Sequence, residues 1–102
     1  MEFKNPYMST EDKIELLERW IIVHSIRYYE MDDPIIKDSQ FDKNARQLAA
    51  MLRQFPQDAK KSKYAYCFKG FDGSTGHHLY RQLNKSDRAY LTQIAQMLDR
   101  VR

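Results

Sequence analysis

The spacing of apolar residues predicts a mainly α-helical protein organised around a long first helix. Ile14, Leu17, Ile21 and Tyr28 recur at helical intervals, which indicates a helix over about residues 10–31. Further apolar residues widen this stripe near the middle of the helix: Leu16, Trp20, Ile22, Val23 and Ile26. A helix that is apolar over most of its circumference needs packing partners on more than one side.

A second amphipathic stretch predicts a helix over about residues 39–55. Its apolar residues are spaced by four, three, four and three positions, so they share one face: Phe41, Ala45, Leu48, Leu52 and Phe55. The connection to the first helix is short. We therefore expect the two helices to pack as an antiparallel pair.

Polar residues and prolines mark the ends of this pair. Ser9 or Thr10 can cap the first helix, and Pro34 stops it because the residue before a proline is pushed out of the helical region. Asp38 is placed to cap the second helix, and Pro56 ends it.

The second half of the chain has weaker signals. Residues 64–68 alternate enough to predict a short strand, and a short helix is expected over about residues 77–83. A final helix over about residues 86–100 would be capped by Ser86. Its apolar face contains Leu91, Ile94, Leu98 and Val101.

The 102 residues are expected to form a single domain, with no room for a second, catalytic one. We divide it into an arm at 1–8, the helical pair at 9–56, a linker with a glycine loop at 57–76, and C-terminal helices at 77–102.

Composition excludes several classes of protein. The longest apolar run, Trp20 to Val23, is too short to cross a bilayer, and the N-terminus lacks a signal-peptide pattern, so we expect a cytoplasmic protein without membrane contact. Cys67 is the only cysteine, so no intrachain disulfide can form, and we expect a small, partly buried residue.

Charge gives a weak indication of nucleic-acid binding. The net charge is +3, and basic and acidic residues are mixed along most of the chain, whereas a duplex-binding protein usually has a denser basic stripe. One hypothesis is nevertheless a nucleic-acid accessory protein that uses basic residues of the second half: Lys60 to Lys69, Arg81, Lys85 and Arg88.

The most informative residues flank the turn between the two long helices: Tyr28, Tyr29, Asp38, Phe41 and Asp42. Antiparallel packing would bring the tyrosines at the end of the first helix next to the acids at the start of the second. Aromatic faces and carboxylates together attract a cationic aromatic ring. A structural interpretation is also open, with Phe41 in the core, Asp38 as a helix cap and Tyr28 as packing.

The stretch that contains these residues resembles the N-terminal helical subdomain of bacterial NAD-dependent DNA ligases. The resemblance is carried, without a gap, by Tyr28-Tyr29, Asp32, Pro34, Asp38, Phe41-Asp42, Leu48 and Pro56. It implies a subdomain that folds over the nicotinamide mononucleotide half of NAD. By position, Tyr28 and Tyr29 would stack on or border the nicotinamide ring, and Asp38 and Asp42 would accept hydrogen bonds from its amide or the ribose. Phe41 stands where the family usually has tyrosine.

In that family a separate nucleotidyltransferase domain supplies the lysine that becomes adenylated. The resemblance therefore implies a non-catalytic module without ligase or adenylation activity of its own and without a required cofactor. It would bind NAD or nicotinamide mononucleotide, or dock on a nucleotidyltransferase or another protein of DNA metabolism. The apolar surface around Trp20 and Ile22 would give that partner something to bury. Small size and partial likeness suggest a phage or another mobile element as the origin.

A different hypothesis is a small enzyme acting on nicotinamide mononucleotide or NAD, with Asp38 or Asp42 as its acid or base. Such a role needs a carboxyl group with a raised pKa beside the bound ring.

A glycine-rich loop forms a second candidate site. Gly73, Ser74, Thr75 and Gly76 could present backbone N–H groups to an anion, with Lys69 adding positive charge. A tight turn capped by Asp72 or Ser74 explains the same residues. The following His77 and His78 point about 100 degrees apart on a helix, so we expect no metal site.

Overall fold

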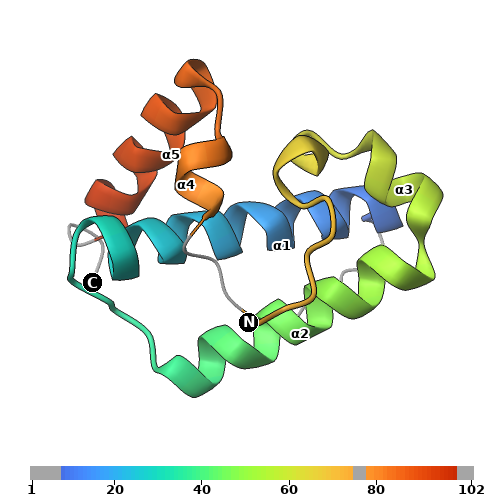
Figure 1. The fold of residues 1–102 in the computed structure, drawn as a ribbon, viewed down its shortest axis with the longest axis horizontal. Coiled ribbons are helices and arrows are strands. Elements are labelled where there is room, and N and C mark those ends of the chain that lie inside the picture. The colour runs from blue at the N-terminus through green and yellow to red at the C-terminus, as the bar shows by residue number, and fades with distance from the viewer. Residues whose placement is uncertain (1–7, 75–77, 99–102) are drawn as a thin grey trace.

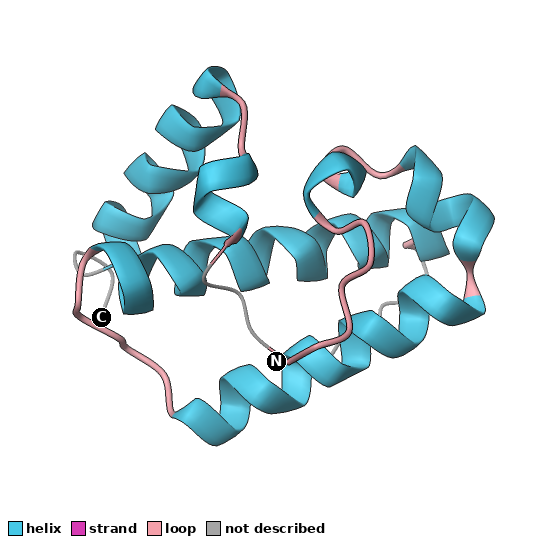
Figure 2. Ribbon diagram, in the orientation of Figure 1, coloured by secondary structure: helices cyan, strands magenta, loops and turns pink. Residues whose placement is uncertain are grey.

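The computed structural model describes residues 8–74 and 78–98, and every regular element within them is helical (Figures 1 and 2). This confirms the mainly α prediction. The elements in chain order are α1 (Thr10–Ser25), the π-helical turn η1 (Ile26–Glu30), α2 (Asp38–Gln54), α3 (Pro56–Lys61), the 3-10 turn η2 (Ala65–Cys67), α4 (Leu79–Gln82) and α5 (Lys85–Met97).

Helix α1 lies at the centre of the fold. Figure 1 shows α2 running back along one side of it, α4 and α5 on the opposite side, and α3 beside its first turns. Ile14, Leu17, Ile21, Ile22 and Ile26 are fully or almost fully buried, and the core also takes residues from α2, α4 and α5. The expected antiparallel pair and the need for partners on several sides are both confirmed.

The apolar surface that we expected on the first helix is used within the protein. Ile22 is fully buried, and Trp20 packs against the rings of His24 and Phe41, with centroid distances of 4.4 and 6.2 Å. Assigning Ile22 to a partner-binding surface was therefore wrong. Ile22, which broadens the apolar stripe, is part of the hydrophobic core of the protein.

The caps of the helices agree with the sequence at one end and differ at two others. The Ser9 hydroxyl accepts the Asp12 N–H at 3.1 Å, as predicted. Helix α2 begins one residue earlier than expected: Lys37 is its N-cap, and Asp38 lies in the first turn, where negative charge favours the helix dipole. Helix α5 is capped by Asn84, whose side chain accepts the Asp87 N–H at 2.8 Å, and not by Ser86.

The first helix does not continue to residue 31 as an α-helix but widens into the π turn η1. The Met31 N–H donates to the Ile26 carbonyl five residues back, at 3.0 Å. Asp32 then adopts a positive φ of 50°, which reverses the chain, and the Asp33 N–H donates to the Arg27 carbonyl at 2.8 Å. A π turn in an α-helix often occurs at a functional site.

The predicted strand at 64–68 is wrong, because these residues form the 3-10 turn η2. Tyr64, Cys67 and Phe68 are buried, whereas Tyr66 is exposed, so the true apolar period is helical and not alternating. The Cys67 N–H donates to the Tyr64 carbonyl at 2.9 Å, which satisfies the backbone locally. The preceding linker is also more ordered than expected, since Pro56 occupies the first turn of α3.

The C-terminal helices lie close to their expected places. Helix α4 spans the second part of the short helix predicted over 77–83, and α5 covers most of the range 86–100. Leu91 is fully buried, and Ile94 and Leu98 pack against the core. His77, Val101 and the arm up to residue 7 lie outside the described residues.

Candidate functional site

The residues singled out at the helix junction line one pocket of about 160 Å³. The pocket wall consists of Tyr28, Tyr29, Asp38, Phe41, Asp42 and Ser74. The tyrosines come from η1 and the acids and Phe41 from the first two turns of α2, so the antiparallel pair brings them together as expected. Ligand binding by these residues stays a prediction.

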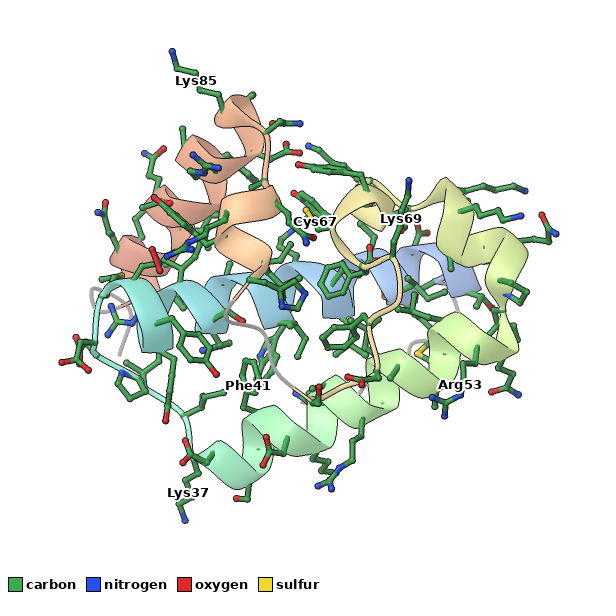
Figure 3. The ribbon with its side chains drawn as sticks, in the orientation of Figure 1. Lys37, Phe41, Arg53, Cys67, Lys69 and Lys85 are labelled. Atoms are coloured by element: carbon green, nitrogen blue, oxygen red, sulfur yellow. The ribbon has the colours of Figure 1, made fainter. Side chains whose placement is uncertain are left out.

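Three aromatic rings form the apolar part of this pocket. The Tyr28 and Tyr29 rings meet edge to face with centroids 4.8 Å apart, and each side chain is about two-fifths exposed, at 42% and 43%. Phe41 extends from α2 toward α1 (Figure 3), where its ring packs near the ring of Trp20. Phe41 thus belongs to the pocket wall and to the edge of the core at once, so the binding and packing interpretations are compatible.

The acids form the polar part of the pocket. Asp38 and Asp42 are four residues apart on α2, so their side chains lie on the same face, and both are exposed to solvent. Two carboxylates beside three aromatic rings favour a cationic, flat ligand group.

Arg27 holds the turn that carries the two tyrosines. Its side chain is fully buried, and its guanidinium donates to the Asp33 carboxylate at 2.8 Å and to the Ala95 carbonyl of α5 at 3.3 Å. The chain around Asp33 is therefore tied both to η1 and to the C-terminal helix. Sequence reasoning missed this residue, although a lone basic residue within the apolar stretch Ile26 to Tyr28 is the signal that could have identified it.

The loop 72–74 reaches the same pocket from the second half of the chain. Gly73 has a positive φ of 86°, and a Cβ atom there would lie 3.1 Å from the Ala45 carbonyl oxygen, so the loop packs directly on the α2 backbone. This close approach places Ser74 in the pocket wall. The sequence predicts Ser74 only as part of an anion-binding loop, and the structure places it beside the tyrosines.

The turn interpretation of this loop accounts for its hydrogen bonds. The Ser74 N–H and hydroxyl both bond to the Asp72 carboxylate, which lowers the pKa of Asp72. Lys69 lines a different pocket, and Thr75 and Gly76 lie outside the described residues. Anion binding by Lys69, Gly73, Ser74, Thr75 and Gly76 stays a prediction.

A shallow hollow of about 280 Å³ continues from the pocket along α2. It shares Asp42 and Ser74 with the pocket and adds Arg46, Asp72 and Gly73. Arg46 provides a positive charge one helical turn beyond Asp42.

Two further kinds of chemistry-bearing group are relevant to this site, the single cysteine and clusters of metal-ligating side chains. Cys67 is buried, and burial raises the pKa of its thiol to about 11, so it is protonated at neutral pH. Across residues 8–74 and 78–98, no group of three or more His, Cys, Asp or Glu side chains could hold a metal ion, and no helix is long and apolar enough to span a membrane.

Comparison with known proteins assigns part of the sequence to a family. The family model described as "DNA ligase-like, N-terminal NAD+-binding domain" matches residues 7–62. That segment contains both tyrosines, Phe41 and both acids of the pocket, whereas Ser74 lies beyond it.

Individual relatives agree with the family match. The DNA ligase of Syntrophus aciditrophicus is 43% identical over 49 residues, which is 48% of this chain and 7% of the relative. The DNA ligase of Coprothermobacter proteolyticus is 42% identical over 45 residues, or 44% of this chain, and that of Thermotoga maritima is 35% identical over 46 residues, or 45% of this chain; each match again covers 7% of the relative. The chain thus spans a small fraction of these relatives, and no solved structure matches it. Because the family model covers more than half of its residues, the protein belongs to the family of DNA ligase-like, N-terminal NAD+-binding domains.

Proposed function

We propose that this protein binds a nicotinamide nucleotide at the pocket between η1 and α2 and acts through binding, without catalysing a reaction of its own. The observation that carries the proposal is the convergence of Tyr28, Tyr29, Asp38, Phe41 and Asp42 on one pocket within the family-matched segment.

The size and charge of the pocket suit the nicotinamide ring. A volume of about 160 Å³ is below that of pockets that enclose a drug-sized ligand, so it accommodates a ring and not a whole dinucleotide. The pyridinium ring of NAD and nicotinamide mononucleotide is flat and positively charged. Aromatic faces attract such a cation, and the carboxylates of Asp38 and Asp42 add attraction and accept hydrogen bonds.

The adjoining hollow supports the mononucleotide as the bound half. With the ring between the tyrosines and Phe41, the ribose phosphate extends toward Arg46, which lines the hollow beside Asp42. A guanidinium pairs well with a phosphate. Asp72 also lines the hollow and limits the negative charge that the hollow can accept.

Solvent exposure favours binding over catalysis. An acid or base matched to neutral pH needs a carboxyl group in a desolvating environment, and Asp38 and Asp42 are both exposed. The exposed parts of Tyr28 and Tyr29 leave one side of a bound ring open. We propose that a nucleotidyltransferase partner closes over this side.

A titration followed by amide chemical shifts tests the proposal. Nicotinamide mononucleotide and NAD should give saturable shifts in residues 28–42, and AMP, which lacks the nicotinamide ring, should not. Asp42→Ala should weaken mononucleotide binding by about ten-fold, the loss of one charge-assisted hydrogen bond. Asp58→Ala removes an acid on α3, outside the pocket, and should leave the affinity unchanged.

The proposal fails if millimolar mononucleotide produces no saturable shift in residues 28–42. It also fails if Asp42→Ala and Asp58→Ala lower the affinity equally, because the effect would then be one of net charge and not of the pocket.

A further inference from the structure

A second pocket, of about 550 Å³, lies at the other end of the α1–α2 pair. It is formed by the last turn of α2, by α3 and by the segment from η2 to residue 71. Its lining shares no residue with the nicotinamide pocket. Half of the lining residues, those from Ala65 to Phe71, lie beyond the segment that the family model matches.

The interior of the second pocket is apolar and partly aromatic. Phe68 and Phe71 meet edge to face with ring centroids 5.1 Å apart, and Leu52, Pro56 and Ala59 complete the apolar wall. The volume falls within the range of sites that hold small molecules. A flat apolar group would be shielded from water on these surfaces, which gives a favourable hydrophobic contribution.

The rim of the second pocket is positively charged. Arg53 of α2, Lys60 of α3 and Lys69 of the loop after η2 all line it and are exposed. Figure 3 shows both Arg53 and Lys69 in the half of the molecule that contains α3, with Lys69 above the ribbon near η2 and Arg53 below α2. Within the described residues, none of the three takes part in an ion pair or a hydrogen bond. Their charge is therefore available to a ligand.

Glu18 is the one acid that lines this pocket among the described residues, and it lies at the inner wall, fully buried. Neither of its carboxyl oxygens has a hydrogen-bond partner there, and the nearby Ser62 hydroxyl donates to the Ala59 carbonyl at 2.9 Å. Burial raises the pKa of Glu18 to about 7, and Glu15 adds to the increase. At pH 6 the carboxyl group is therefore mostly protonated and does not repel an anion.

From this arrangement we infer that the second pocket binds a small aromatic anion, with its ring against Phe68 and Phe71 and its acid group on the part of the basic rim that Lys60 and Lys69 supply. Apolar walls alone would accept any hydrophobic molecule. The two unpaired lysines select the one that carries a carboxylate or phosphate.

Matched probes test this inference at pH 6. The probes are 2-naphthoate, the neutral 2-naphthol with the same ring system, and acetate, which has the charge without the ring. We expect saturable amide shifts in residues 65–71 with naphthoate, binding by naphthol that is about ten-fold weaker, and no saturable binding of acetate.

Two double variants distinguish the effect of the rim lysines on binding from the effect of the protein's net charge. Lys60→Met with Lys69→Met should weaken naphthoate binding by about ten-fold and leave naphthol binding unchanged. Lys37→Met with Lys85→Met removes the same charge from lysines that Figure 3 shows away from this pocket, and it should change neither. Equal affinity for naphthoate and naphthol, or equal losses in the two double variants, would overturn the inference, as would the absence of saturable naphthoate binding. None of these outcomes depends on nicotinamide binding at the first pocket.

Discussion

The two pockets lie at opposite ends of the same helix pair and are built in opposite ways. The first pocket, between η1 and α2, is small, is walled by exposed tyrosines and acids, and comes almost entirely from residues close in sequence, between 28 and 42. The second pocket is larger and apolar with a basic rim, and it needs α2, α3 and the segment after η2 to meet. Local spacing therefore reveals the first pocket, whereas only the tertiary fold creates the second.

A buried ionisable residue lies next to each pocket, and the two residues differ in whether their charged groups have hydrogen-bond partners. Arg27 supports the turn that carries the tyrosines of the first pocket and is paired with Asp33 and with the Ala95 carbonyl. Glu18 borders the second pocket without a hydrogen-bond partner among the described residues. A buried charge with hydrogen-bond partners holds the groups around it in place. A buried acid without partners is easier to bury in its neutral form, so its pKa rises.

Breaking the support of the first pocket should have the largest effect. Arg27→Met removes the guanidinium and leaves the Ala95 carbonyl and the Asp33 carboxylate without this donor. We expect a loss of about 3 kcal/mol in the free energy of unfolding, measured by urea denaturation. Asp33→Asn, which keeps a hydrogen-bond acceptor at a more exposed site, should cost about 1 kcal/mol. Equal losses in the two variants would show that the ion pair, and not the buried guanidinium network, holds the turn.

Stability should depend on pH in a way that distinguishes two buried residues of α1, Glu18 and His24. Glu18 has a folded-state pKa of about 7 against an ordinary value of 4.5, so between these pH values the folded protein holds a proton that the unfolded chain has lost. The contribution of Glu18 to the free energy of unfolding is therefore largest below pH 4.5. It falls by about 3 kcal/mol as the pH rises to 7.

His24 acts in the opposite direction near the first pocket. Burial lowers its pKa from 6.5 to about 4, with Arg27 contributing, so the unfolded chain binds the extra proton and stability rises with pH between 4 and 6.5. The two slopes nearly cancel in the wild-type protein over pH 4.5–6.5. Urea denaturation across pH should uncover them: Glu18→Gln leaves a stability that rises with pH, and His24→Gln leaves one that falls. Parallel profiles for both variants would contradict this assignment.

The close packing of the loop on α2 can be tested with a pair of glycines. Gly73→Ala places a Cβ atom 3.1 Å from the Ala45 carbonyl at a positive φ, so we expect a loss of about 2 kcal/mol in stability and weaker mononucleotide binding, because Ser74 is displaced. Gly70 also has a positive φ, but a Cβ atom there meets nothing within 4 Å. Gly70→Ala should cost about 1 kcal/mol and leave mononucleotide binding unchanged.

Sequence reasoning recovered the features that depend on local spacing. The apolar faces of α1 and α2 predicted the antiparallel pair, and the positions of Tyr28, Asp38 and Asp42 within it predicted their meeting at one pocket. Features that depend on contacts between residues far apart in the sequence were missed. Ser74 reaches the pocket only because Gly73 allows a backbone contact with α2, and no local pattern records that contact.

The errors near residues 64–68 and at Ile22 have a shared physical cause. Five residues with apolar side chains at 64, 67 and 68 fit a helical turn as well as a strand, and backbone hydrogen bonding decides between them. Ile22 widens an apolar stripe, and whether another protein or the chain itself covers that stripe depends on tertiary packing. The second pocket was missed for the same reason, since Glu18, Lys60 and Phe71 have no spacing in common.

The smallest predicted effect concerns Phe41, the position where the ligase resemblance implies tyrosine. Phe41 lines the first pocket while its ring packs near Trp20, so we expect that a hydroxyl group can be added at the pocket side without disturbing the core. Phe41→Tyr should increase mononucleotide affinity by about five-fold, which corresponds to about 1 kcal/mol from one added hydrogen bond. Phe68→Tyr adds the same hydroxyl to the second pocket and should leave mononucleotide affinity unchanged. If Phe41→Tyr weakens binding instead, the ring at this position contributes through packing alone, and recognition of the ligand rests on the two tyrosines and the two acids.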